Sequence, residues 1–266
     1  RRIAFYGAHA RMLPRKRGES AFFIASADHS AATLQSRRIS VGGKTVSFFI
    51  TLLESSDASR RALEAEPRVH AMVHHGLTPE EYRVLLRELY HIVRHFSPAM
   101  ATAAARCGDD FGAVRDALQA RIQEEKGREA SVLEDIEAMG GDVFAARASL
   151  PSAPVQALIA FNYYATEHVH PCAVLGMLYV FEVIASVYGG RVCEAIARKT
   201  GRDASAGGFK FLSSHAAMDL DHMASLNRLM RTIADPAAQA AIIRSANVNF
   251  HQFSQIFRIG GPLGPA

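Results

Sequence analysis

His215, Asp219 and His222 have side chains that ligate metals, and they are spaced at i, i+4 and i+7 in the run FKFLSSHAAMDLDHMASLNRLMRTI. On a helix these positions project within about 60° of one another, on the same stripe as Phe211 and Leu226. Three titratable groups on an inward stripe need a compensating partner, because burying them unpaired is costly. A divalent cation is one such partner, and these donors suit iron, manganese or zinc. A buried hydrogen-bonded cluster without metal is the alternative.

Two other segments carry carboxylates in apolar surroundings. Glu182 lies within CAVLGMLYVFEVIASV, which is apolar almost all round and is typical of a central helix. Glu125 and Glu129 interrupt the apolar stripe of a helix that we expect over residues 111–139. Carboxylates and imidazoles from facing helices form the non-haem diiron and dimanganese sites of helical bundles. For Glu182, a neutral carboxyl bonded to a tyrosine is the alternative.

The elements that position these residues are predicted to be helices. Thr78-Pro79-Glu80-Glu81 is a helix start, with Thr78 as the cap and Glu81 closing a capping box. We expect residues 1–55 to form an N-terminal extension with a β-hairpin around Gly42-Gly43, residues 56–257 an all-α bundle, and residues 258–266 a disordered tail. The other expected helices span about 57–75, 111–139, 154–168, 171–188, 191–200, 206–233 and 236–257.

Composition narrows the function classes. The 266 residues carry a net charge of +4, and the only basic cluster is Arg15-Lys16-Arg17, which argues against nucleic-acid binding. Three scattered cysteines match no zinc pattern and indicate reduced thiols in a cytoplasmic protein. No signal peptide is visible. The longest apolar run, residues 172–187, is short for a membrane span and contains Glu182, so we expect no membrane association.

The set Glu125…Glu182…His215-x3-Asp219-x2-His222 resembles the heme-oxygenase-like diiron oxidases and oxygenases, the metal-using relatives of the TenA and PqqC proteins. The stretches EEKGREASVLEDIEAMGG and FLSSHAAMDLDH contribute to this resemblance, which covers about residues 60–235. It implies a helical bundle of heme-oxygenase type, often dimeric, in which these five residues bind one or two irons. It also implies that dioxygen oxidises an amino-acid-like or fatty-acid-like substrate, by N-oxygenation, C–C cleavage or desaturation.

One position departs from the family pattern. The resemblance implies a sixth ligand, a histidine, where this chain has Arg128, and a protonated guanidinium cannot ligate iron. We therefore expect Arg128 to pair with Glu125 or Glu182 and to disfavour a second iron. Tyr90 and Tyr179 are expected near the substrate and are, with Arg128, the candidate catalytic residues.

Two other functions fit the same residues. A metal-free enzyme of the TenA or PqqC kind would use the carboxylates as acid and base. A metal-deficient binding protein without catalysis is favoured only by Arg128. A small-molecule substrate and a homodimer are expected for the enzyme.

Overall fold

The computed structural model describes residues 40–41, 44–45, 47–204 and 207–258, without the side chains of residues 215–220. The chain divides into two units, Arg1–Thr45 and Val46–Ala266. In the first unit, β1 (Ser40–Val41) pairs antiparallel with β2 (Lys44–Thr45). These strands flank Gly42-Gly43, where the hairpin was expected. From residue 259 onward the expected tail lies outside the described residues.

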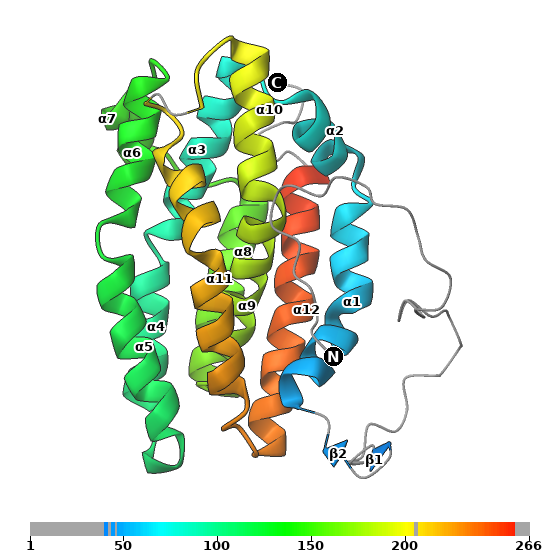
Figure 1. The fold of residues 1–266 in the computed structure, drawn as a ribbon. Coiled ribbons are helices and arrows are strands. Elements are labelled where there is room, and N and C mark those ends of the chain that lie inside the picture. The colour runs from blue at the N-terminus through cyan, green and yellow to red at the C-terminus, as the bar shows by residue number, and fades with distance from the viewer. Residues whose placement is uncertain (1–39, 42–43, 46, 205–206, 259–266) are drawn as a thin grey trace, which may run out of the picture. The chain divides into compact units, whose positions relative to one another are not determined.

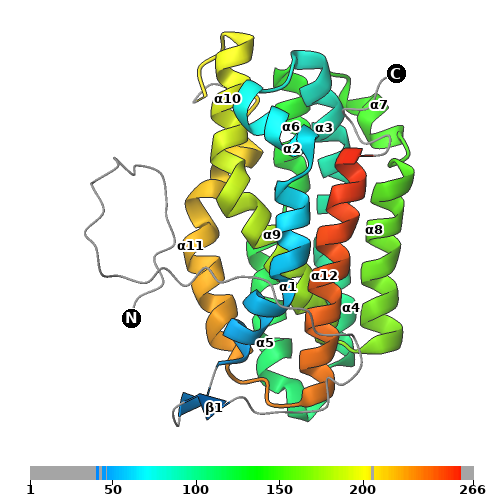
Figure 2. The same cartoon turned by 90° about the vertical axis from the view of Figure 1, so that its right-hand side faces the viewer.

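The second unit is a helical bundle, which confirms the all-α prediction. Its long helices lie side by side, with α12 packed along α9 and α1 (Figures 1 and 2). The helices are α1 (Phe48–Glu64), α2 (Pro67–His75), α3 (Pro79–Val93), α4 (Phe96–Arg106), η1 (Asp109–Phe111), α5 (Gly112–Glu125), α6 (Arg128–Ala138), α7 (Val143–Ala148), α8 (Ala153–Tyr164), η2 (Ala165–Val169), α9 (Ala173–Ile184), η3 (Ala185–Gly189), α10 (Gly190–Thr200), α11 (Lys210–Met230) and α12 (Pro236–Arg258).

The helix expected to be central is α9, and it is buried on nearly every side. It continues through η3 into α10, so Ala173–Thr200 forms one helical run of 28 residues. The break predicted at Gly189-Gly190 was wrong, because both glycines keep right-handed helical backbone angles. By length and composition alone this run is long enough to cross a membrane, but 67% of its most apolar window is buried within the bundle. Its apolar composition is that of a core helix.

Three other boundaries differ from the sequence prediction. The first helix begins at Phe48, inside the extension that was expected over residues 1–55. The helix expected over 57–75 is two helices, because Pro67 begins α2 after a break at Ala65 and Glu66. A separate helix, α4, follows α3 and was not anticipated. The capping box at Thr78 and Glu81 is present as predicted.

The break with the greatest effect divides the expected helix 111–139 into α5 and α6. Lys126 is extended and Gly127 has a left-handed φ of 86°, a conformation that glycine adopts readily. The break shifts the helical phase, so Arg128 is buried while Glu129 is only half-buried. The sequence pattern had placed Glu129 inward, which was wrong because the pattern assumed an unbroken helix.

The start of α11 is held by α6. Asp135 is 1% exposed, and its carboxylate accepts hydrogen bonds from the backbone N–H groups of Lys210 (2.9 Å) and Phe211 (2.8 Å). Burial raises the pKa of Asp135 above its ordinary value, although these hydrogen bonds oppose the increase. A carboxylate from one helix thus satisfies backbone donors in the first turn of the helix that carries His215, Asp219 and His222.

Gly176 permits the close packing of α9 on α12. A Cβ atom at this position would lie 2.3 Å from the carbonyl oxygen of Ile242. We expect Gly176→Ala to lower the free energy of unfolding by about 1–3 kcal/mol, because the two backbones must separate. Urea denaturation measures this loss. Gly112→Ala is the matched control, since a Cβ there meets only Arg115 at 3.5 Å. Equal stabilities of the two variants would contradict the prediction.

We expect Asp135→Ala to leave two N–H groups of α11 without their acceptor, at a cost of about 1–3 kcal/mol. Hydrogen exchange should accelerate at the start of α11 more than in α9. Glu134→Ala is the control, because the carboxylate of Glu134 accepts a hydrogen bond from the exposed ammonium group of Lys210 rather than from the backbone of α11. Unchanged protection of Lys210 and Phe211 would show that Asp135 does not anchor this helix.

Candidate metal centre

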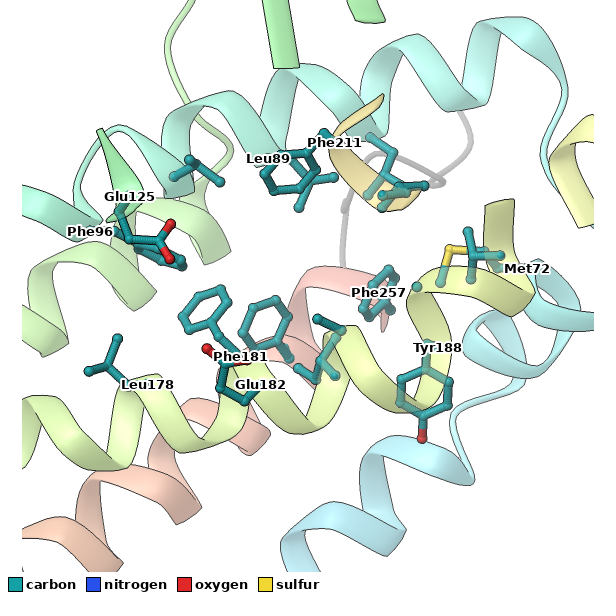
Figure 3. A pocket seen from close by; sticks show the side chains of 18 of the residues that line it. Met72, Leu89, Phe96, Glu125, Leu178, Phe181, Glu182, Tyr188, Phe211 and Phe257 are labelled. Atoms are coloured by element: carbon teal, nitrogen blue, oxygen red, sulfur yellow. The ribbon is translucent and has the colours of Figure 1, made fainter. Parts of the chain in front are cut away.

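A cavity of about 110 Å³ lies inside the bundle. Figure 3 shows Glu125 and Glu182 toward one end, and Met72 and Tyr188 toward the other. Apart from Arg121, Glu125 and Glu182, the side chains that line it are apolar or aromatic. These are Met72, Leu85, Leu89, Val93, Phe96, Leu178, Phe181, Ile184, Ala185, Tyr188, Val192, Phe211, Leu212, Phe253 and Phe257.

The run that contains Glu182 changes its winding just beyond this residue. η3 (Ala185–Gly189) is a π-helical turn, with more residues per turn than the α-helix before it. Ala185, Tyr188 and Gly189 of this turn all line the cavity. Such turns are frequent near functional sites, and here one forms the wall next to a buried carboxylate.

Arg121 joins the two buried carboxylates. Its Nε donates a hydrogen bond to Oε1 of Glu125 (2.8 Å), and its Nη2 donates to Oε1 of Glu182. The side chains of Glu125 and Glu182 are 3% and 5% exposed, and that of Arg121 is 17% exposed. Burial alone would lower the pKa of Arg121, but the two carboxylates outweigh it and raise the pKa. The guanidinium therefore stays charged.

His222 of α11 reaches the same cluster. Its Nδ1 lies 3.5 Å from Oε1 of Glu182, and its Nε2 lies 3.6 Å from Oε2 of Glu124 on α5. Burial raises the pKa of Glu182, but the contacts with His222 and Arg121 outweigh it and leave this pKa below its ordinary value. Glu182 is thus an ionised carboxylate at neutral pH, and the alternative of a neutral carboxyl does not hold.

Arg128 adds a second positive charge to the cluster. Its Nε lies 2.8 Å from Oε2 of Glu125, three residues earlier across the break at Gly127. The expected pairing of Arg128 with a carboxylate is confirmed, and the partner is Glu125. Two arginines and two glutamates therefore balance one another in this part of the interior.

The donor atoms fit a metal ion in type. Within the described part of the chain, Oε2 of Glu182 and Nδ1 of His222 are buried without a hydrogen-bond partner, whereas Oε2 of Glu125 is paired with the guanidinium of Arg128. Carboxylate and imidazole donors of this kind suit iron or manganese. Among the described residues, however, no three His, Cys, Asp or Glu side chains are close enough together to hold an ion. The guanidinium of Arg121 contacts both carboxylates.

The other predicted site residues have different positions. His215 and Asp219 belong to α11, but their side chains lie outside the described residues. Tyr90 and Tyr179 are buried and do not line the cavity. The hydroxyl of Tyr179 lies 3.1 Å from Oγ of Ser56 on α1, so it is a core residue with its own polar partner. The geometry gives neither tyrosine the expected position beside the substrate.

Arg121 was missed by the sequence analysis. It lies four residues before Glu125, so it shares the inward side of α5 with that carboxylate. The sequence contained one signal for it, because a basic residue lies one helical turn before an acid that was predicted to be buried. The contact with Glu182, 61 residues further along the chain, depends on how α5 packs, and the sequence pattern does not reveal it.

The chain is similar to known proteins in sequence and in fold. Residues 83–250 match the family described as iron-containing redox enzymes. No curated protein matches.

Three solved structures share the fold. One is a domain of unknown function with a heme oxygenase-like fold from Shewanella denitrificans, 20% identical, with a TM-score of 0.71 over 80% of this chain and 91% of that one. A TenA homologue from Pseudomonas syringae is 15% identical, with a TM-score of 0.66 over 79% and 91%. A TenA family transcription regulator from a Silicibacter species is 14% identical, with a TM-score of 0.65 over 82% and 97%.

At these identities the solved structures establish the heme-oxygenase-like fold and nothing about activity. The family match covers more than half of the chain and includes Glu125, Glu182 and His222. This chain belongs to the family of iron-containing redox enzymes.

Proposed function

We propose that this protein is a non-haem iron-dependent oxygenase or oxidase that uses dioxygen to oxidise a small organic molecule. The observation that supports the proposal most is the position of Glu125 and Glu182 at one end of an apolar cavity, with His222 in contact with Glu182. These three residues would hold iron together with His215 and Asp219, as the resemblance implies. Bound iron supplies the redox chemistry toward dioxygen that amino-acid side chains lack.

The protein itself provides a largely apolar chamber. Phe96, Leu178 and Phe181 lie near the two carboxylates (Figure 3) and form an apolar wall beside them. A low-dielectric surrounding strengthens each electrostatic contact within the cavity. The same side chains restrict the orientation of a bound molecule.

The lining favours one of the two substrate classes that the resemblance implies. Among the side chains that the structure describes, the charged ones that line the cavity lie at one end, and the rest of the wall is hydrocarbon or aromatic. An alkyl chain with a carboxylate head matches this distribution, with Arg121 as a partner for the head. An amino-acid-like molecule carries polar groups along its length, and most of the wall would leave them unpaired.

A metal-free enzyme is the second candidate function. Arg121 and Arg128 already neutralise Glu125 and Glu182, and two of the similar solved structures are described as TenA proteins. Against it, none of the three cysteines lines the cavity, and all are buried. Burial raises the pKa of Cys172 to about 12, which keeps this thiol protonated and unreactive. The ionised Glu182 is also poorly suited to act as a general acid.

Replacing His222 tests the iron centre. We expect the unmodified protein to bind about one iron per chain, because Arg128 provides a charge rather than a ligand at the sixth position. His222→Ala should lose most of this iron, since it removes an imidazole donor while keeping the helix. Iron is measured by mass spectrometry after anaerobic loading, and helix content by circular dichroism.

His251→Ala is the matched control, because His251 is an exposed residue of α12 that does not line the cavity. It should retain the full iron content. Equal iron in the His222 and His251 variants would exclude His222 as a ligand. Negligible iron in the unmodified protein would favour the metal-free function.

Binding of an alkyl carboxylate tests the substrate class. We expect a medium-chain fatty carboxylate to raise the melting temperature of the iron-loaded protein, because a ligand that binds only the folded state stabilises it. Free amino acids at the same concentration should have a smaller effect. The cavity-filling variant Leu89→Trp should lose the response to the carboxylate.

Leu150→Trp is the control for that variant, since Leu150 is 83% exposed and lies outside the cavity. It should respond as the unmodified protein does. A larger stabilisation by amino acids than by the alkyl carboxylate would overturn the proposed substrate class.

A further inference from the structure

Arg121 occupies a position that conflicts with metal binding, and this inference rests on the iron centre proposed above. Its guanidinium presents Nε to Glu125 and Nη2 to Glu182, so one edge of the group faces both carboxylates at once. A metal ion held by these two side chains would bind the same two carboxylate groups that the guanidinium contacts. Two cations cannot share that space without strong repulsion in an apolar interior.

The charge balance of the cluster also indicates that a metal ion and the two arginines cannot all be accommodated. The negative charges of Glu125 and Glu182 are matched by Arg121 and Arg128. A divalent ion added to this arrangement would leave positive charge in excess, even with the carboxylate of Asp219 counted as a further ligand of the proposed centre. Burying uncompensated charge is costly, so a positive group must leave or an anion must enter.

Of the two arginines, Arg121 is the one placed to leave. Arg128 is buried at the start of α6 and contacts only one of the two carboxylates, Glu125. Arg121 bridges both and is 17% exposed, and its long flexible side chain has a route toward solvent.

We propose that Arg121 is the counter-cation of the metal-free centre, that a metal must displace its guanidinium from Glu125 and Glu182, and that this residue thereby sets metal affinity. In the metal-free protein it keeps the two carboxylates paired and correctly placed. In the loaded protein its freed guanidinium lies at the charged end of the cavity.

The opposite role for Arg121 makes a different prediction. A guanidinium that stays bonded to the Oε1 atoms while the metal binds the Oε2 atoms would orient the ligands, and its removal would weaken binding. The sign of the change in affinity therefore distinguishes displacement from support.

The test measures Mn²⁺ affinity by the electron paramagnetic resonance signal of free Mn²⁺, without any assay of activity. We expect Arg121→Gln to bind Mn²⁺ about tenfold more tightly or better than the unmodified protein, because a repelling charge is gone. The metal-free form of this variant should melt at a lower temperature, since two buried carboxylates lose a partner. Weaker or unchanged Mn²⁺ affinity would overturn the proposal.

Arg60→Gln is the matched control. Arg60 also bridges two carboxylates, Asp57 and Glu64, but on α1 and outside the cavity. Its replacement should leave Mn²⁺ affinity unchanged. All proteins carry His74→Ala, because the neighbouring imidazole rings of His70 and His74 on α2 offer the probe two exposed nitrogen donors.

A second measurement uses the protein that keeps Arg121, so its result does not depend on whether the Arg121→Gln variant folds. Phenylglyoxal modifies accessible guanidinium groups, and mass spectrometry locates the modified residues. Displacement predicts that Mn²⁺ increases the reactivity of Arg121 and leaves that of Arg60 unchanged. Protection of Arg121 by Mn²⁺, or no change, would contradict displacement.

Including His222→Ala separates failure of this proposal from failure of the proposed function. If Mn²⁺ binding depends on His222 but does not improve in Arg121→Gln, only the displacement proposal fails. If His222→Ala and the unmodified protein both bind Mn²⁺ measurably and with equal affinity, the metal centre itself is wrong, and so is the displacement proposal. If Mn²⁺ binds only after Arg121 is replaced, displacement is supported in its strongest form.

Discussion

Two carboxyl side chains lie in the hydrocarbon interior of this bundle, and their requirement for positively charged partners governs the centre. Glu125 comes from the end of α5 and Glu182 from the middle of α9, and each is almost fully buried. Arg121 and Arg128 supply the opposing charges. The cost of leaving any of these groups unpaired holds α5, α6 and α9 together at one level of the bundle. The apolar cavity begins where this charged cluster ends.

Much of the fold was predictable because helix periodicity and capping are local. The capping box at Thr78, the central position of α9 and the inward direction of Glu182 all follow from residues within one or two turns. The errors occurred where single residues change the path of the backbone. The apolar pattern predicted one continuous helix across Gly127, but the helix breaks at this residue. The pair Gly189-Gly190 predicted the end of a helix, but Gly189 lies within a continuous helical run.

The centre was predictable only in part. The buried carboxylates and His222 were found from their positions on apolar stripes, and the pairing of Arg128 from its proximity in sequence. The bridge from Arg121 to Glu182 joins α5 to α9, and no local pattern encodes it. Tyr179 was predicted to lie near the substrate because it faces the interior, but its hydroxyl contacts Ser56 of α1 rather than the cavity. Periodicity tells which residues are buried but not which neighbour they meet.

The polarity of the cavity has a consequence for regiochemistry. Its charged groups lie at one end, and Met72 and Tyr188 lie toward the other (Figure 3). A molecule with an acidic head and an alkyl tail can therefore enter in only one direction, because the reverse orientation buries its charge in hydrocarbon. Oxidation would then occur at carbon atoms near the head, whatever the length of the tail. The depth of the cavity would limit the length of the alkyl tail, independently of which carbon atom is oxidised.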